Sequence, residues 1–152
     1  MATHAQMQAR AVRNGGDPSD AGADDVRLSL PARPENIAVI RHVLAAFAEA
    51  VKLPDGMIED LRLAVTEACT NVVRHAYKDG VGAIEISIRP ERGGLRVVVA
   101  DHGHGLGPSP DKRGPGLGLP LIAALADAVE FEHEPAGSRI TMSFARRRPE
   151  AA

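Results

Sequence analysis

The sequence contains very few aromatic residues. Tryptophan is absent, and one tyrosine and three phenylalanines occur among 152 residues. The core is therefore expected to be aliphatic, and there are too few rings for a platform on which single-stranded nucleic acid could stack. The formal net charge of −2 provides no basic field that would attract nucleic acid. We therefore expect no direct binding to nucleic acid.

Cysteine and long apolar runs are also scarce. Cys69 is the single cysteine, which excludes an intrachain disulfide and is typical of a reducing compartment. No base partner for its thiol is evident, so we expect a small buried or partly buried side chain. Residues 1–25 lack the apolar stretch of a signal peptide, and no run is long enough to cross a bilayer. These absences predict a cytoplasmic protein without membrane contact.

The remaining patterns predict one α+β domain at residues 26–145, between a flexible tail at 1–25 and a short basic tail at 146–152. Helical spacing of apolar residues predicts helices over 35–51, 55–77 and 117–127, the second with Asp55 as its N-cap. Alternation predicts strands over 26–30, 84–88, 95–100, 129–133 and 139–144. Hairpins join consecutive strands, so we expect a two-layer α/β sandwich with a mainly antiparallel or mixed sheet and helices on one face.

The second predicted helix carries polar residues at four-residue intervals, Glu67, Asn71 and His75. Residues four apart on an α-helix lie on the same face. The neighbouring face is apolar and should be buried; it comprises Leu61, Val65, Ala68 and Val72. The Asn71 carboxamide could bind Mg²⁺, and Glu67 could deprotonate a hydroxyl or a water. Taken alone, the stripe is equally typical of a solvated helix surface.

The first glycine-rich segment, Asp-His-Gly-His-Gly-Leu-Gly, begins at Asp101 after a predicted buried strand. Gly103 and Gly105 permit close backbone approach, and a carboxylate at a strand end can accept a hydrogen bond from an exocyclic amine. The spacing differs from the dinucleotide-binding pattern, and a simple turn after a strand is the other interpretation. His102 and His104 are more typical of solvated side chains than of a metal site.

The second glycine-rich segment, residues 114–119, opens the third predicted helix. Free amide groups and the helix dipole at such an N-terminus favour phosphate. A P-loop is excluded because the lysine and hydroxyl residue that it requires are missing. A linker without a ligand is an equally good interpretation of this segment alone.

In combination, the motifs are more specific. A Glu-xxx-Asn-xxx-His helix is followed by Asp-x-Gly-x-Gly, then by Gly-x-Gly-Leu-Gly-Leu, then by Gly-Ser before the last strand. This order resembles the GHKL (histidine-kinase-like) ATPase domain over about residues 26–145. Residues 66–77 look like the N-box of the anti-sigma-factor serine/threonine protein kinases, within that family.

The resemblance implies an ATP-binding serine protein kinase with Mg²⁺ as its metal ion. Glu67 would be the catalytic base for a protein serine hydroxyl, Asn71 would coordinate Mg²⁺, and Asp101 would contact the adenine amino group. Gly103 and Gly105 would line the nucleotide. The other implied nucleotide contacts are Lys112, Arg113, Gly116, Leu117, Gly118 and Ser138. Of these, Lys112 and Arg113 would approach the γ-phosphate, and Ser138 stands where the family usually has threonine.

The resemblance also implies partners. Such proteins form homodimers, bind and sequester a sigma factor, and phosphorylate a STAS-domain anti-anti-sigma protein; Arg41 matches a position used for partner contact. The segment between the glycine motifs, residues 106–113, is shorter than the lids of the best-known members. A non-catalytic regulatory module that binds ATP and sequesters its partner is therefore the alternative. A histidine-kinase fragment is disfavoured because no phosphoacceptor helix precedes the domain.

Overall fold

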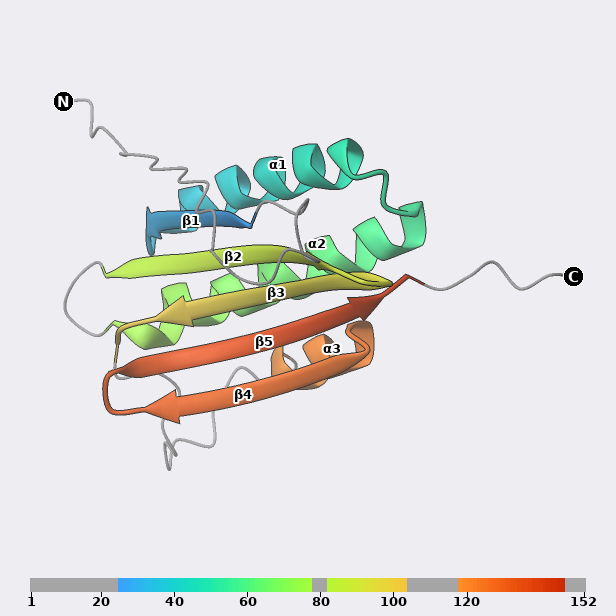
Figure 1. Cartoon of the computed structure of the whole chain (residues 1–152). Coiled ribbons are helices and arrows are strands. Elements are labelled where there is room, and N and C mark those ends of the chain that lie inside the picture. Colours follow the sequence, from blue (N-terminus) through green and yellow to red (C-terminus); the bar gives the residue numbers. More distant parts are fainter. Residues whose placement is uncertain (1–24, 78–81, 104–117, 147–152) are drawn as a thin grey trace, which may run out of the picture.

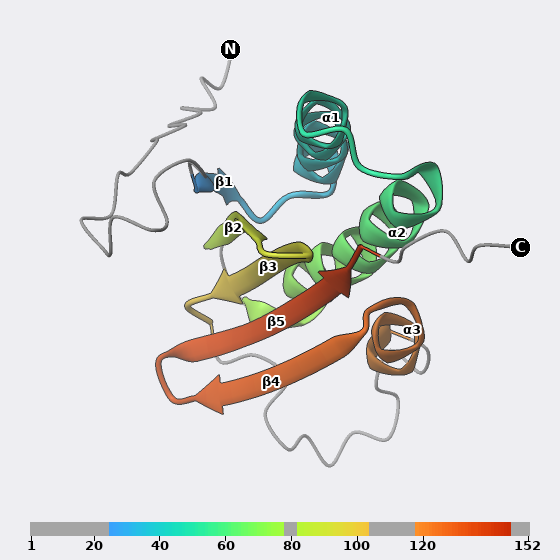
Figure 2. The same ribbon diagram turned by 45° about the vertical axis from the view of Figure 1, so that its right-hand side comes forward.

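A five-stranded antiparallel sheet carries three α-helices on one of its faces (Figures 1 and 2). The computed structural model describes residues 25–77, 82–103 and 118–146. The elements are β1 (Val26–Pro31), α1 (Pro34–Ala50), α2 (Asp55–Asn71), the π-helical turn η2 (Val72–Ala76), β2 (Ala83–Glu91), β3 (Gly94–Asp101), α3 (Gly118–Leu125), β4 (Ala128–Glu134) and β5 (Gly137–Ala145). The strand order is β1-β2-β3-β5-β4, and every neighbouring pair is antiparallel. The predicted fold class is confirmed.

The strands form a sheet with one apolar face because their apolar residues alternate with polar ones. The side chains that face the helices are buried in the three inner strands: Ile84, Ile86 and Ile88 in β2, Leu95, Val97 and Val99 in β3, and Ile140, Met142 and Phe144 in β5. Phe144 is the one aromatic residue among the buried core residues that the structure describes. The core is therefore aliphatic, as the composition predicts.

The helices cover this apolar face through residues at helical spacing. On α1 the buried apolar residues are Ile40, Leu44 and Ala48. The predicted apolar face of α2 is buried, with Leu61 and Val65 fully inaccessible, and Cys69 is buried beside it. Asp55 is not the N-cap that the sequence predicts. Pro54, with an extended backbone, occupies that position, and Asp55 is the first helical residue, where its charge suits the helix dipole.

The end of α2 also differs from the prediction of one helix to Tyr77. The α-helix ends at Asn71 and continues as the wider turn η2. A π-helical turn contains more residues than an α-helical one and often lies at a functional site. The four-residue rule consequently fails after Asn71, and the predicted stripe is uneven: Asn71 is buried, whereas Glu67 and His75 are half-buried. No helix in the described ranges is long and apolar enough to cross a membrane.

The aliphatic core yields a stability prediction on α2. Leu61→Ala removes a fully buried side chain and should lower the free energy of unfolding by about 2–5 kcal/mol through lost burial and a residual cavity. Leu63→Ala, on the same helix but 44% exposed, should change it by less than about 0.5 kcal/mol. Urea unfolding of both variants checks the prediction, and equal losses would contradict the assignment of the core.

Candidate functional site

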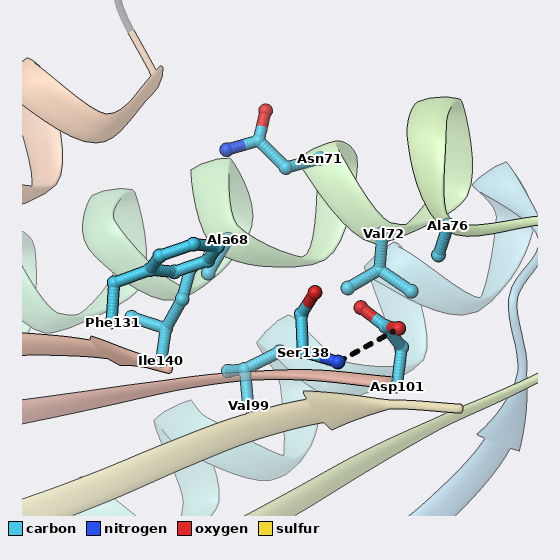
Figure 3. Close-up of a pocket in the computed structure, with 9 residues that line it drawn as sticks. All are labelled: Ala68, Asn71, Val72, Ala76, Val99, Asp101, Phe131, Ser138 and Ile140. Carbon is cyan, nitrogen blue, oxygen red and sulfur yellow. Dashed lines mark hydrogen bonds between the residues drawn. The ribbon is translucent and has the colours of Figure 1, made fainter. Parts of the chain in front are cut away.

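A pocket lies between the C-terminal part of α2 and the helix-covered face of the sheet (Figure 3). It brings together three predicted site residues, Asn71 from α2, Asp101 from the end of β3 and Ser138 from β5. The rest of its lining is apolar: Ala68, Val72, Ala76, Val99, Phe131 and Ile140. The cavity volume is about 20 Å³, which is room for about one water molecule.

Asp101 is buried at one end of this pocket. Its Oδ1 accepts hydrogen bonds from the backbone N–H groups of Gly103 at 3.0 Å and Ser138 at 3.3 Å. Burial raises the pKa of this carboxyl group, and the two N–H groups, together with His102 and His133, act in the opposite direction. Both hydrogen bonds from described residues use Oδ1, so Oδ2 is the atom available to a ligand.

Ser138 lies beside Asp101, as Figure 3 shows, and is also buried. Its hydroxyl lies 2.9 Å from Nδ1 of His133 on the neighbouring strand β4. The sequence predicts Ser138 as a site residue but does not indicate His133. The register between β4 and β5 places the two side chains opposite each other, and only the paired strands show this.

Asn71 lines the same pocket and is 4% exposed. Its Nδ2 is buried and has no hydrogen-bond partner among the residues that the structure describes. Leaving a buried donor unpaired costs about 1–3 kcal/mol. An unsatisfied amide of this kind, at the edge of a pocket with a carboxylate, is a suitable group for a polar ligand or its metal ion.

Glu67 lies one helical turn before Asn71 but does not line the pocket. Its side chain is half-buried, so it is reachable from outside. The structure therefore places the predicted catalytic base, Glu67, outside the pocket that contains Asn71, Asp101 and Ser138, although Glu67 and Asn71 both lie on α2.

Two glycines allow the chain segments around the pocket to approach closely. A Cβ on Gly103 would overlap the carbonyl group of Ala76, which is the last residue of η2. Gly137 has a φ of +147°, and a Cβ there would overlap the carbonyl oxygen of Asp101. The sequence predicts Gly103 as a nucleotide contact. In the structure Gly103 also lies against the Ala76 carbonyl at the end of η2.

Tyr77 connects three segments next to the pocket, and the sequence does not indicate this role. Its hydroxyl donates a hydrogen bond to the carbonyl of Ala83 at 2.7 Å and accepts one from the backbone N–H of His102 at 3.0 Å. A Cβ on Gly82 would overlap the ring. Burial is the largest of the effects that raise the pKa of Tyr77. The phenol therefore stays protonated at neutral pH and keeps its donor function.

Other predicted residues lie elsewhere. Gly118 is the first residue of α3, and Arg41 is exposed on α1. His102 is exposed, with Nε2 3.0 Å from the Glu85 carboxylate. Five predicted nucleotide contacts lie outside the described residues: Gly105, Lys112, Arg113, Gly116 and Leu117. His104 also lies outside them.

The sequence did not predict the apolar lining of the pocket, which includes Phe131. The apolar residues that line the pocket follow the same spacing along the chain as ordinary core residues, so the sequence cannot tell the two apart.

The Tyr77 hydrogen bonds yield the second prediction. Tyr77→Phe keeps the ring but leaves the Ala83 carbonyl and the His102 amide without their shared partner. We expect a loss of about 1–3 kcal/mol in the free energy of unfolding and faster hydrogen exchange at the His102 amide. Chemical unfolding and amide exchange measure both, and an unchanged exchange rate at His102 would contradict this role of Tyr77.

Comparisons with known proteins agree with this geometry. Residues 30–144 match the histidine kinase-like ATPase domain. The serine-protein kinases RsbW of Bacillus thuringiensis (strain Al Hakam) and Bacillus cereus (strain 03BB102) are each 35% identical to this chain over 126 residues, which span 73% of this chain and 79% of the relative. These relatives confirm the predicted resemblance and the predicted enzyme class, a serine/threonine protein kinase.

Solved structures support the fold. The crystal structure of the RsbU and RsbW domains of Rv1364c from Mycobacterium tuberculosis has a TM-score of 0.67 at 21% identity; the match covers 82% of this chain and 33%, about a third, of the other. The histidine kinase domain from Erythrobacter litoralis EL346 has a TM-score of 0.54 at 19% identity, over 77% of this chain and 62% of the other. With the match over residues 30–144, these findings show that the chain belongs to the histidine kinase-like ATPase domain family.

Proposed function

We propose that this protein is an ATP-dependent serine kinase of the anti-sigma type. In this proposal it binds a sigma factor, phosphorylates a STAS-type anti-anti-sigma protein, forms a homodimer and acts in the cytoplasm, with residues 26–145 as the kinase domain. The observation that carries the proposal is the pocket that unites Asn71, Asp101 and Ser138 from three elements. The 35% identity to proteins named serine-protein kinases supports the reaction type.

The lining of the pocket suits adenine in its chemistry. Asp101 Oδ2 would accept a hydrogen bond from the exocyclic amino group, while Oδ1 is held by two backbone amides. Apolar side chains on both sides would contact the ring faces. Phe131, which is 39% exposed and also lines the pocket, would cover its outer part. The Ser138 hydroxyl would offer a further polar contact.

The phosphates and the metal ion would lie toward Asn71. An amide oxygen, together with phosphate oxygens and waters, is a ligand set that Mg²⁺ prefers, and the unsatisfied Asn71 amide fits this requirement after rotation of its plane. Gly118 would present the N-terminus of α3 to phosphate oxygens. The proposal also retains Gly103, Gly105, Lys112, Arg113, Gly116 and Leu117 as nucleotide contacts.

Bound ATP would supply the phosphoryl group, and Glu67 would handle the proton. Its carboxylate is half-buried and outside the adenine pocket, so a serine hydroxyl from a partner protein could approach it without displacing the nucleotide. Glu67 would accept the hydroxyl proton while the serine oxygen bonds to the γ-phosphorus and the bond from that phosphorus to the departing ADP breaks. Because phosphoryl transfer depends mainly on positioning and electrostatics, the short segment between the glycine motifs is compatible with kinase activity.

The third prediction concerns the proposed base. Glu67→Gln keeps the shape of the side chain but cannot accept the proton, so serine phosphorylation of a STAS-domain protein should fall by about 10²–10⁴-fold. Nucleotide affinity should stay within about threefold because Glu67 does not line the pocket. Phosphate transfer from labelled ATP and a thermal-shift titration with Mg-ATP and Mg-ADP measure the two effects; binding to the folded state raises the melting temperature.

The controls for this experiment separate the alternatives. Asn71→Ala should abolish the Mg-ATP-dependent thermal shift. Transfer that persists in Glu67→Gln would reject Glu67 as the base. Nucleotide-dependent capture of a partner without phosphate transfer by the unsubstituted protein would favour the regulatory binding module. The absence of any thermal shift with ATP would contradict both.

The fourth prediction concerns Asp101. Asp101→Asn can still accept both amide hydrogen bonds, but its NH₂ group would then face the adenine amino group, so ATP should bind about 10–100-fold more weakly. Burial raises the folded-state pKa of Asp101. The carboxyl group therefore contributes most to the free energy of unfolding below its unfolded pKa of about 3.9. This contribution is lost as the pH rises through the folded-state pKa.

Asparagine does not ionise and so avoids this loss. The melting temperature of Asp101→Asn at pH 7 should equal or exceed that of the unsubstituted protein, and the difference should shrink in acid. Isothermal titration with ATP and melting curves between pH 3 and pH 7 measure the two properties. Unchanged ATP affinity would exclude Asp101 as the adenine contact.

A further inference from the structure

A groove separate from the candidate pocket lies where β5 ends, on the helix-covered side of the sheet. In Figures 1 and 2 the tip of β5 lies between the start of α2 and the end of α3. We call this the terminal groove. Its cavity volume is about 600 Å³, and it shares no lining residue with the candidate pocket. The lining includes Met57, Glu59 and Asp60 of α2, Leu125 of α3, Asp127 just after it, and Phe144 of β5.

The terminal groove carries negative charge. Glu59 and Asp60 are exposed on the second turn of α2, and Asp127 is exposed in the short segment after α3. No described residue with a positive charge lines the groove. Asp60 forms no ion pair with a described residue, and Glu59 has one described partner, Arg62, at 4.0 Å. The groove therefore offers carboxylates to a cation that its described lining does not provide.

The apolar part of the lining suits the stem of a long cationic side chain. Met57 and Phe144 are buried core residues, and Leu125 is half-buried against the core. Arginine lays its methylene groups on apolar surface while its guanidinium group stays with charges or water. Guanidinium also binds a carboxylate through two parallel hydrogen bonds, which the ammonium group of lysine does not. The terminal groove therefore fits a peptide segment that contains arginine.

The basic tail of this chain starts at the same groove. Ala145, the last residue of β5, lines it, and Arg146 follows. The Arg146 amide donates a hydrogen bond to the Gly93 carbonyl at 2.7 Å, which extends the pairing with β3 by one residue. Side chains of a strand alternate in direction, so Arg146 lies on the same side as Phe144, which faces the helices. Arg146 is exposed and has no ion pair with a described residue.

The tail also has the complementary charge, because Arg146, Arg147 and Arg148 are consecutive. The base of the tail is held beside the groove, since the Ala145 amide donates a hydrogen bond to Oδ2 of Asp127 at 2.7 Å. Three extended residues span at most about 11 Å, so all three arginines stay within reach of the groove. A tether this short gives an effective concentration of about millimolar or more, which compensates for the weakness of single exposed ion pairs.

We propose that Arg146, Arg147 and Arg148 dock in the terminal groove of their own chain and pair with Glu59 and Asp60. The structure describes Arg146, whereas Arg147 and Arg148 lie outside the described residues. The docked tail joins the start of α2 to the end of α3, two helices that pack against each other. The proposal uses no part of the candidate pocket and does not rest on the kinase function.

A disulfide trap tests where the tail lies. Pro149→Cys keeps all three arginines, and Gly56→Cys adds a thiol in the groove, where a Cβ meets nothing within 4 Å. The native Cys69 is buried, and burial raises its pKa to about 12, so it does not compete. Equilibration with glutathione measures the effective concentration of the two introduced thiols. We expect a value at least tenfold higher than for Pro149→Cys paired with Arg92→Cys.

Arg92 is the matched control because it lies near the base of the tail but outside the groove. It is exposed in the β2–β3 turn, next to Gly93, whose carbonyl binds the Arg146 amide. Equal values for the two cysteine pairs would overturn the proposal, since the tail would then show no preference for the groove. Linkage between two chains instead of within one, seen as a dimer on a non-reducing gel, would also overturn it.

Charge reversal with rescue tests the chemistry of docking. Glu59→Lys with Asp60→Lys places like charges in contact, so it should lower the effective concentration of the groove pair at least fivefold. Adding Arg147→Glu and Arg148→Glu should restore it to within about threefold of the starting value. Salt at about 1 M, where the Debye length is about 3 Å, should act in the same direction as the first two reversals.

The reversed groove residues are exposed, so the variants should fold, and melting curves on the same samples check this. Glu59→Gln with Asp60→Asn removes the charges without reversing them and should lower the effective concentration by a smaller factor. Linkage that none of these changes affects would overturn the proposal. Failure of the fourfold reversal to restore linkage would overturn the pairing of arginines with carboxylates.

Hydrogen exchange on the chain without introduced cysteines gives an independent measurement. Arg147→Glu with Arg148→Glu should speed exchange at the amides of Leu125 and Ala126, at the end of α3, at least threefold, because the tail no longer holds this end. The Val97 amide, in the middle of β3, is the control and should not change. Unchanged exchange at the end of α3 would overturn the proposal.

The outcomes separate this proposal from the kinase proposal. Glu67→Gln should leave the effective concentration of the groove pair unchanged, since Glu67 does not line the terminal groove. A protein that phosphorylates its partner but shows no preference of the tail for the groove would exclude only the docking. A protein whose tail docks as expected but that transfers no phosphate would exclude only the kinase.

Discussion

The candidate site depends on the contact between the end of η2 and the ends of β3 and β5. Gly103 lies against the Ala76 carbonyl, and Gly137 lies against the Asp101 carbonyl. The Asp101 carboxylate accepts hydrogen bonds from the amides of Gly103 and Ser138, and so it connects two strands and the segment that follows β3. Close backbone approach is possible there because glycine has no Cβ. A side chain at either position would separate the elements that form the pocket.

The pocket retains polar groups that are unfavourable for folding alone. Asn71 has a buried nitrogen without a described partner, and burial disfavours the charged form of Asp101. Sequences that break local rules in this way often do so at functional sites. The surrounding aliphatic core, including fully buried Leu61 and Ile88, supplies the stability that offsets these groups. Both groups line the same pocket, and in the proposed function a bound nucleotide would satisfy them.

The two faces of the sheet have different compositions. The helix-covered face is aliphatic and borders the candidate pocket. The opposite face, the open face, carries Val98 and Ala100 on the central strand and charged residues such as Arg27 and Glu130 on the edge strands. The same strands can present two different faces because successive side chains of a strand point to opposite sides of the sheet. In β3, for example, Val99 contributes to the pocket while Val98 and Ala100 belong to the open face.

The sequence alone was sufficient for the fold class, the order of the elements and three of the pocket residues. The alternation of Ile84, Ile86 and Ile88 and the helical spacing on α2 are local signals, so they can be read without coordinates. Motif order identified Asn71, Asp101 and Ser138. The sequence prediction failed at both ends of the second helix: Pro54, and not Asp55, occupies the N-cap position, and the π-helical turn replaces the last turn of the predicted helix.

Only the tertiary structure decided the roles of Tyr77, His133 and Gly137 and the separation of Glu67 from the pocket. The roles of Tyr77 and Gly137 depend on contacts between segments far apart in the chain, such as the hydrogen bond that the His102 amide donates to the Tyr77 hydroxyl. The contact between His133 and Ser138 depends on the register of the β4–β5 hairpin. The strand order β1-β2-β3-β5-β4 likewise comes only from the tertiary structure, because β5 lies between β3 and β4. Local periodicity specifies which residues face the core, but it contains no information on which strands are neighbours.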